Sequence, residues 1–192
     1  MMSVKTKRMD FKDFGPVLST RERGREAADR VQDALRAGPL VLNFHGVEIA
    51  TPSFLDEIVV RLAGLLMNNE TLVVAITGMN PDVRDSMELI LDKRGVALTL
   101  LSGDQIELLG GSEQVRQTLA AAQKLGRFSA KDLARELKVK LPSLHQRLNV
   151  LLDSGAITRK ADPSAKRGRR YDFTAPSAED LKPEALGRIA VG

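Results

Sequence analysis

Cysteine and tryptophan are both absent from the 192-residue sequence, which also contains only two histidines. Without cysteine the chain holds no disulfide framework, no thiolate zinc site and no cysteine nucleophile. The same absence fits a reducing compartment. Because there is no cluster of histidine and cysteine either, we expect neither a metal nor another cofactor.

Long apolar runs are lacking as well. No stretch reaches the roughly 18 apolar residues that a membrane span needs, and the stretch nearest to that length is broken by Asp56, Glu57 and Arg61. The N-terminal segment MMSVKTKRMDFKDFG has no apolar core of signal-peptide length. We therefore expect a soluble, cytoplasmic protein that does not bind membranes.

Signatures of catalysis are missing. His45 lies near Ser53 and Asp56 in the sequence, but there is no G-x-S-x-G motif to present a serine nucleophile. Neither G-x-x-x-x-G-K-[ST] nor G-x-G-x-x-G is present to hold a phosphate. We interpret His45 as a histidine at the end of a strand and predict that the protein is not an enzyme.

Charge is present but unevenly placed along the chain. Residues 1–111 carry 13 Lys and Arg against 16 Asp and Glu, which gives −3. Residues 112–173 carry 14 against 6, which gives +8, and residues 174–192 carry 2 against 3, which gives −1. Such asymmetry indicates a part that binds a polyanion, joined to a part that does something else.

A boundary is expected at Gly110-Gly111-Ser112, where paired glycines end an apolar run and a helical pattern follows. We divide the chain into a domain over residues 1–111, a domain over residues 112–175 and a tail over residues 176–192. The tail has a short helical pattern at residues 183–189. It is expected to dock on a domain, to mediate a dimer contact or to stay mobile.

Residues 1–111 alternate strands and helices. Apolar runs predict buried strands at residues 40–44, 71–77 and 96–101. Helices are predicted to start at Ser19, which forms a capping box with Glu22, at Pro52-Ser53 and at Asn80-Pro81. Residues 4–11 are expected as an edge strand, and residues 105–109 as an edge strand or a turn of helix. The alternation predicts the α/β class with a mostly parallel sheet.

The segment VLNFHGVEIATPSFLDEI (41–58) resembles the STAS domain of bacterial anti-sigma factor antagonists, and more closely the STAS-like family of unknown function. The matching elements are Ser19 to Arg21, Asn43 to Val47, Ser53 to Glu57 and Asn80-Pro81. The resemblance covers residues 14–101. It implies an α/β domain that binds a protein partner and is usually not an enzyme.

Ser53 falls where anti-sigma factor antagonists carry a phosphorylated serine. A helix N-terminus favours a phosphate, but Asp56 and Glu57 in the first turn are expected to repel one. The sequence also departs from the pattern, with Thr51 in place of an acidic residue and Phe54 in place of glycine. Two interpretations stay open: Thr51 or Ser53 caps the helix, or Ser53 is a phosphorylation site.

Residues 112–175 contain three helical patterns followed by a hairpin. The helices are predicted at residues 113–126, 128–139 and 142–155, the second capped by Ser129 with Asp132 at its third position. The strands are predicted at residues 156–161 and 169–175, with a basic loop between them. Two helices joined by a short turn, the second with a polar leading face, are typical of a helix-turn-helix.

This segment resembles the winged helix-turn-helix of small bacterial repressors of the MarR and ArsR type, in FSAKDLARELKV, LHQRLNVLLDSGAITR and RGRRYDFT. The resemblance implies that the third helix enters the major groove of double-stranded DNA while the wing lies on the adjacent backbone or minor groove. The groove-facing candidates are polar: Ser143, His145, Gln146, Arg147 and Asn149. The phosphate-binding candidates are basic: Lys138, Lys140, Arg159, Lys166, Arg167, Arg169 and Arg170.

Two functions from different classes follow. The first is a transcription regulator, with a STAS-like sensor or partner-binding domain fused to a DNA-binding winged helix. The alternative is a protein-interaction switch akin to an anti-sigma factor antagonist, in which the winged helix docks protein. A two-fold symmetric operator would require a homodimer.

Overall fold

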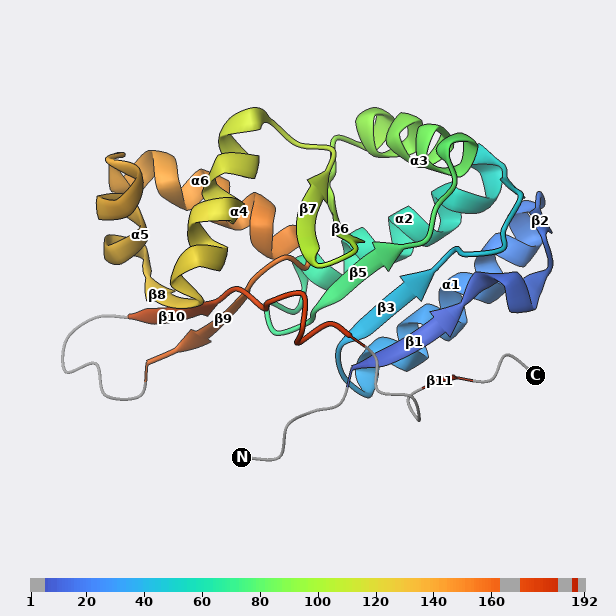
Figure 1. The fold of residues 1–192 in the computed structure, drawn as a ribbon, viewed down its shortest axis with the longest axis horizontal. Helices are drawn as coiled ribbons and strands as arrows, with labels where there is room; N and C mark the ends of the chain where they lie inside the picture. Colours follow the sequence, from blue (N-terminus) through green and yellow to red (C-terminus); the bar gives the residue numbers. More distant parts are fainter. Residues whose placement is uncertain (1–5, 163–169, 183–187, 190–192) are drawn as a thin grey trace.

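The computed structural model describes residues 6–162, 170–182 and 188–189 of the chain (Figure 1). The α-helices are α1 (Arg21–Arg36), α2 (Pro52–Met67), α3 (Pro81–Arg94), α4 (Glu113–Leu125), α5 (Ala130–Leu137) and α6 (Leu141–Asp153). A short 3-10 helix, η1, spans Phe11–Phe14. No helix within the described ranges combines the length and apolar character needed to cross a membrane.

A mostly parallel sheet forms the centre of the molecule, as the sequence predicts. Its strand order is β11-β1-β3-β5-β6-β7, and only the pairing of β7 with β6 is antiparallel. The strands are β1 (Lys7–Asp10), β3 (Leu40–Asn43), β5 (Val74–Thr77), β6 (Leu98–Ser102), β7 (Gln105–Leu109) and β11 (Arg188–Ile189). The mixed α/β class is therefore confirmed, and residues 105–109 form an edge strand rather than a turn of helix.

Strands β3, β5 and β6 are nearly continuous apolar runs, and alternate residues of a strand point to opposite sides of the sheet. Both faces of the sheet are therefore apolar. Leu42 and Ile76 join a hydrophobic cluster with α1, α2 and α3. Val41 and Ala75 join a second cluster with residues of α4, α5 and α6 (Figure 1). The second cluster thus contains residues from both sides of the Gly110–Gly111 link. The division into two domains stays a prediction.

Helix starts in the first 111 residues agree with the sequence in part. Asn80 caps α3, its side chain accepting a hydrogen bond from the N–H of Val83 at 2.8 Å. The cap of α1 is Thr20, whose hydroxyl accepts from Arg23, so the prediction of Ser19 was wrong by one residue. Two short strands that the sequence reading missed, β2 (Val17–Leu18) and β4 (Ile49–Ala50), pair in parallel beside these helices.

The C-terminal helices pack with a three-stranded antiparallel sheet of order β8-β10-β9. Its strands are β8 (Arg127–Ser129), β9 (Thr158–Ala161) and β10 (Tyr171–Thr174). Strand β8 was not predicted, because Phe128 and Ser129 were included in the pattern of the following helix and Arg127 was left between two helices. Phe128 of β8 stacks on Phe173 of β10, with ring centroids 5.6 Å apart, so the short strand closes the core of this part.

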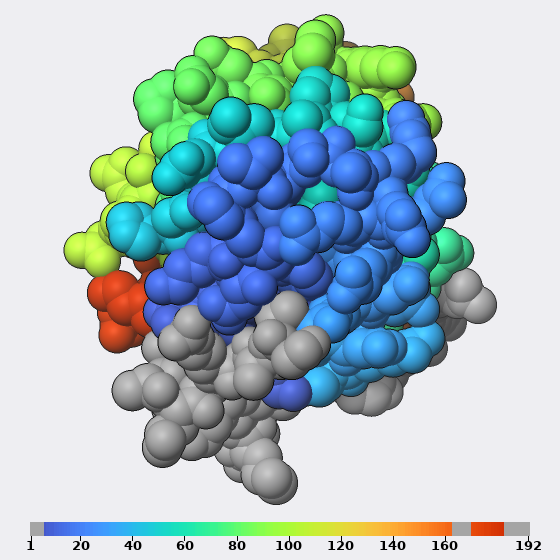
Figure 2. Space-filling view, turned by 90° about the vertical axis from the view of Figure 1, so that its right-hand side faces the viewer, coloured from blue at the N-terminus to red at the C-terminus, as the bar shows by residue number. Residues whose placement is uncertain are grey.

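The tail returns to the first strand of the chain. Thr6 donates a hydrogen bond from its hydroxyl to the carbonyl of Asp180 at 2.7 Å, and Leu181 is fully buried. Figure 2 shows the red tail beside the blue N-terminal segment. Strand β11 pairs in parallel with β1. The helical pattern predicted over residues 183–189 was therefore wrong for Arg188–Ile189, and β1 is an inner strand rather than an edge.

Candidate nucleic-acid interface

Helix α5 is fixed at its start by a complete capping box. The hydroxyl of Ser129 accepts from the N–H of Asp132 at 3.3 Å, and the carboxylate of Asp132 accepts from the N–H of Ser129 at 3.1 Å. The hydrogen bonds from Ser129, with smaller contributions from the charges of Arg135 and Arg170, lower the pKa of Asp132. Both predicted roles, the Ser129 cap and Asp132 at the third helical position, are confirmed.

A three-residue turn joins α5 to α6. It begins at Lys138, which adopts the left-handed conformation with φ of 54° and ends α5. Helix α6 then starts at Leu141 with Pro142 in its first turn, where the missing N–H of proline costs no helical hydrogen bond. The turn leaves Lys138 and Lys140 exposed just ahead of α6.

The two faces of α6 differ sharply in character. Leu144, Leu148 and Leu151 are almost completely buried. Because each residue of a helix turns by about 100°, this spacing places all three on one side of α6. Gln146 is exposed and stands opposite this stripe. Four of the five groove-facing candidates are exposed, and Arg147 is half-buried on the flank of the stripe: Ser143, His145, Gln146, Asn149 and Arg147.

Exposed cations lie at the starts of α5 and α6. Lys140 is the N-cap residue of the helix, and Arg170 lies near Asp132 of α5, whose pKa its charge helps to lower. Lys138, Lys140 and Arg170 form no ion pair with any described residue. Sequence reasoning had passed over Lys131, which is exposed and equally without an ion pair within the described part of the chain; Lys160, beside the predicted wing loop, is exposed as well. The remaining predicted wing residues, Lys166, Arg167 and Arg169, lie outside the described residues.

Several other cations of the basic segment are already neutralised by the protein. Arg159 donates to the carboxylate of Glu70 from Nε and from one terminal nitrogen, and it lies over the ring of Tyr171, 4.4 Å from the centroid. Arg127 binds Asp172 at 2.7 Å, and Lys124 binds Glu136 at 2.8 Å. Arg159 is therefore held in an internal ion pair rather than offered to a phosphate. The charge count alone does not reveal this.

The central sheet holds α6 from behind. Thr99 of β6 donates from its hydroxyl to the carbonyl of Ser154, at 2.9 Å, just beyond the end of the helix. At Gly155 a Cβ would lie 2.9 Å from a methyl carbon of Val74, and φ there is 74°. Only glycine fits that close approach without strain. The buried end of α6 is thus fixed on the sheet, and its exposed half projects beyond it.

Ser53 lies exposed in the first turn of α2, directly after Pro52. Thr51 occupies the N-cap position, but its hydroxyl donates to the carbonyl of Ser19 at 3.0 Å and makes no capping bond. Asp56 binds Arg94 through two hydrogen bonds of 2.8 and 2.7 Å. These bonds lower the pKa of Asp56.

The acidic residues beside Ser53 are thus paired with arginines. Glu57 binds Arg21 at 3.0 Å and Arg25 at 3.4 Å. The expectation that Asp56 and Glu57 repel a phosphate overlooked these partners, which come from α1 and the end of α3. Asp56 also binds Arg94 and not His45. The backbone N–H of His45 donates to the side-chain oxygen of Asn43.

Comparisons with known proteins add no relative to this description. No protein-family model matches the chain, and neither a curated protein nor a solved structure matches it.

Proposed function

We propose that the protein is a DNA-binding transcription regulator, with residues 112–175 acting as a winged helix-turn-helix and residues 1–111 as a STAS-like partner-binding domain. The order α4-β8-α5-α6-β9-β10, with the sheet order β8-β10-β9, supports a winged helix. The alternating helices and mostly parallel sheet support the STAS-like assignment.

One observation carries the proposal: α6 presents a mostly polar, exposed face directly after two lysines that have no ion-pair partner among the described residues. Gln146 stands at the middle of that face, and Asn149 lies beside it. Both side chains are able to donate to and accept from an adenine edge in the major groove. Lys138 and Lys140 would bind the phosphates that flank the groove, which supplies affinity without sequence choice.

The test is fluorescence anisotropy of a labelled random-sequence duplex over a salt series, using the full chain. We expect binding at low salt and a steep loss of affinity as salt rises. The double variant Lys138→Gln/Lys140→Gln should reduce the slope of log affinity against log salt by about one per residue. The matched control is Lys12→Gln/Lys93→Gln, which removes two exposed charges outside residues 112–175. No binding at low salt, or an equal effect of both double variants, would refute the proposal.

The arginine partners of Asp56 and Glu57 favour a second candidate, a protein-interaction switch at Ser53. Arg21, Arg25 and Arg94 outnumber these two carboxylates by one charge, so a phosphate on Ser53 would meet the N-terminus of α2 and a net positive charge. Mass spectrometry of the protein from its own cells should then find phosphorylated Ser53. Its absence under every growth condition tested would count against this switch and leave the DNA-binding proposal untouched.

A further inference from the structure

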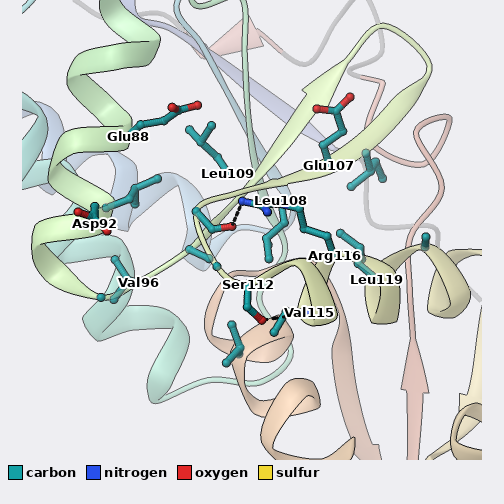
Figure 3. Close-up of a pocket in the computed structure, with 18 of the residues that line it drawn as sticks. Glu88, Asp92, Val96, Glu107, Leu108, Leu109, Ser112, Val115, Arg116 and Leu119 are labelled. Atoms are coloured by element: carbon teal, nitrogen blue, oxygen red, sulfur yellow. Dashed lines mark hydrogen bonds between the residues drawn. The ribbon is translucent and has the colours of Figure 1, made fainter. Parts of the chain in front are cut away.

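A cleft opens at the free edge of the central sheet, between α3 on one side and α4 on the other (Figure 3). Its volume is about 1070 Å³, close to the upper end of the roughly 300–1,000 Å³ range of small-molecule sites. The floor is formed by β7 and by the link from β7 to α4. The walls and floor include apolar side chains of Leu91, Leu108, Leu109, Val115 and Leu119.

Cations at the cleft are occupied by the protein itself. The guanidinium of Arg84 binds Glu88 of the same helix at 2.9 Å. Arg116 donates to the carbonyl of Gly110 at 3.3 Å and lies 3.6 Å from the carboxylate of Glu113. Neither arginine is therefore free to attract an anion into the cleft.

Two carboxylates at the cleft remain without an ion-pair partner among the described residues. Asp92 lies on α3 and Glu107 on β7, both exposed, and Figure 3 shows them on opposite sides of the cleft with Leu109 between. An apolar floor between unpaired negative charges is complementary to an apolar ligand that carries positive charge.

From this geometry we infer that the cleft binds a small amphipathic organic cation, whose apolar body lies on β7 and whose charge lies between Asp92 and Glu107. The site is defined by ligand binding alone and does not depend on DNA recognition. It nevertheless reaches α6, because Val150 lines the cleft one helical turn after Gln146.

Two ions of the same shape and opposite charge test the inference: tetraphenylphosphonium and tetraphenylborate. Each is titrated into the isotopically labelled full chain, and the amide signals of the glycines in the cleft are followed by NMR: Gly95, Gly110 and Gly111. Gly64, which lies exposed on the outer face of α2, serves as the reference signal. We expect the phosphonium to shift the cleft glycines with a Kd at least about tenfold lower than that of the borate.

The charge variants complete the experiment. Asp92→Asn/Glu107→Gln should raise the Kd for the phosphonium at least about fivefold, because it removes both unpaired carboxylates. Asp85→Asn, which neutralises an exposed residue of α3 outside the cleft, should change it by less than about twofold. The inference is overturned when the phosphonium leaves the cleft glycines unmoved, when the borate binds with an equal or lower Kd, or when Asp85→Asn weakens binding as much as the double variant.

Discussion

Glu70 binds Arg159, 89 positions later in the chain, through both its side chain and its backbone. The carboxylate accepts from Nε of Arg159 at 2.6 Å and from one terminal nitrogen as well, while the carbonyl of Glu70 accepts from the N–H of Arg159 at 2.9 Å. Glu70 precedes β5 of the central sheet, and Arg159 lies in β9. This pair therefore ties the hairpin that follows α6 to the sheet.

Substitution Glu70→Gln should lower the free energy of unfolding by about 1 kcal/mol, because Arg159 keeps its stacking on Tyr171 but loses a partner of opposite charge in a half-buried place. Urea denaturation at neutral pH measures the change. The control is Asp33→Asn, which removes an exposed pair with Arg36 and should change the stability by less than about 0.5 kcal/mol. Equal effects of the two substitutions would contradict the structural role of Glu70.

Loss of the hydrogen bond from Thr99 to the carbonyl of Ser154 should clearly lower the free energy of unfolding. Thr99→Val keeps the shape of the side chain but leaves a buried carbonyl without its donor, which costs about 1–3 kcal/mol. Thermal unfolding is the measurement. Thr118→Val is the matched control, since the hydroxyl of Thr118 bonds only to a carbonyl of its own helix. That variant should lose less than about 1 kcal/mol, and the reverse order of stability would be evidence against the bond.

Gln146 and Lys140 are expected to differ in what their loss does to DNA binding. After an operator has been selected from sheared genomic fragments, Gln146→Ala should reduce specificity over random DNA by about 1–3 kcal/mol with an unchanged salt slope. Lys140→Ala should weaken binding to all sequences and reduce the slope by about one. Competition anisotropy measures both quantities. A slope change in the Gln146 variant would show that this residue does not read bases.

Asp56 should make stability depend on pH in the acidic range. Its hydrogen bonds with Arg94 lower its pKa in the folded protein, so the charged form stabilises the fold. That stabilisation is fully present above the pKa of Asp56 in the unfolded chain, which is about 4. It is lost as the pH falls below about 4 and through the lower pKa of Asp56 in the folded protein. Asp56→Asn should therefore cost about 1 kcal/mol at pH 7 and less at pH 3.

Urea denaturation at both pH values measures the cost, with Asp85→Asn as the control because no ion pair of the described residues involves Asp85. A cost for Asp56→Asn that is the same at pH 3 and pH 7 would show that the pair with Arg94 does not contribute. The comparison isolates one group, since other carboxylates with a lowered pKa, such as Asp132, are present in all three proteins.

Local patterns predicted the α-helices and the parallel strands of the main sheet well, because each depends on periodicity and caps within about 15 residues. The starts of α3 and α5 were predicted from Asn80 and Ser129, whose side chains accept hydrogen bonds from backbone N–H groups in the first turn of each helix. Strands β8 and β11 were missed, since three and two residues carry no periodicity. Their existence depends on partners more than 40 positions away in the chain.

The candidate interface was predictable to a similar depth. Four of the five groove-facing candidates chosen from the leucine stripe of α6 are exposed, because buried and exposed positions recur with the helical period; the exception is Arg147. What the sequence could not show was which cations are free. Arg159 and Lys131 each add one positive charge to the sequence count, but Arg159 binds Glu70 whereas Lys131 is exposed to solvent. The cleft beside β7 was also invisible, since its two walls come from helices on either side of the link at Gly110.

The pairing of β11 with β1 can form only late in the synthesis of the chain. A ribosome releases Lys7–Asp10 long before Arg188, so β1 must wait for almost the entire chain before its outer neighbour arrives. Until then its unpaired backbone groups offer a template to other nascent chains, the usual start of aggregation. A chain cut short before Arg188 would carry that exposed edge permanently, which makes the last strand a safeguard against association as much as a part of the sheet.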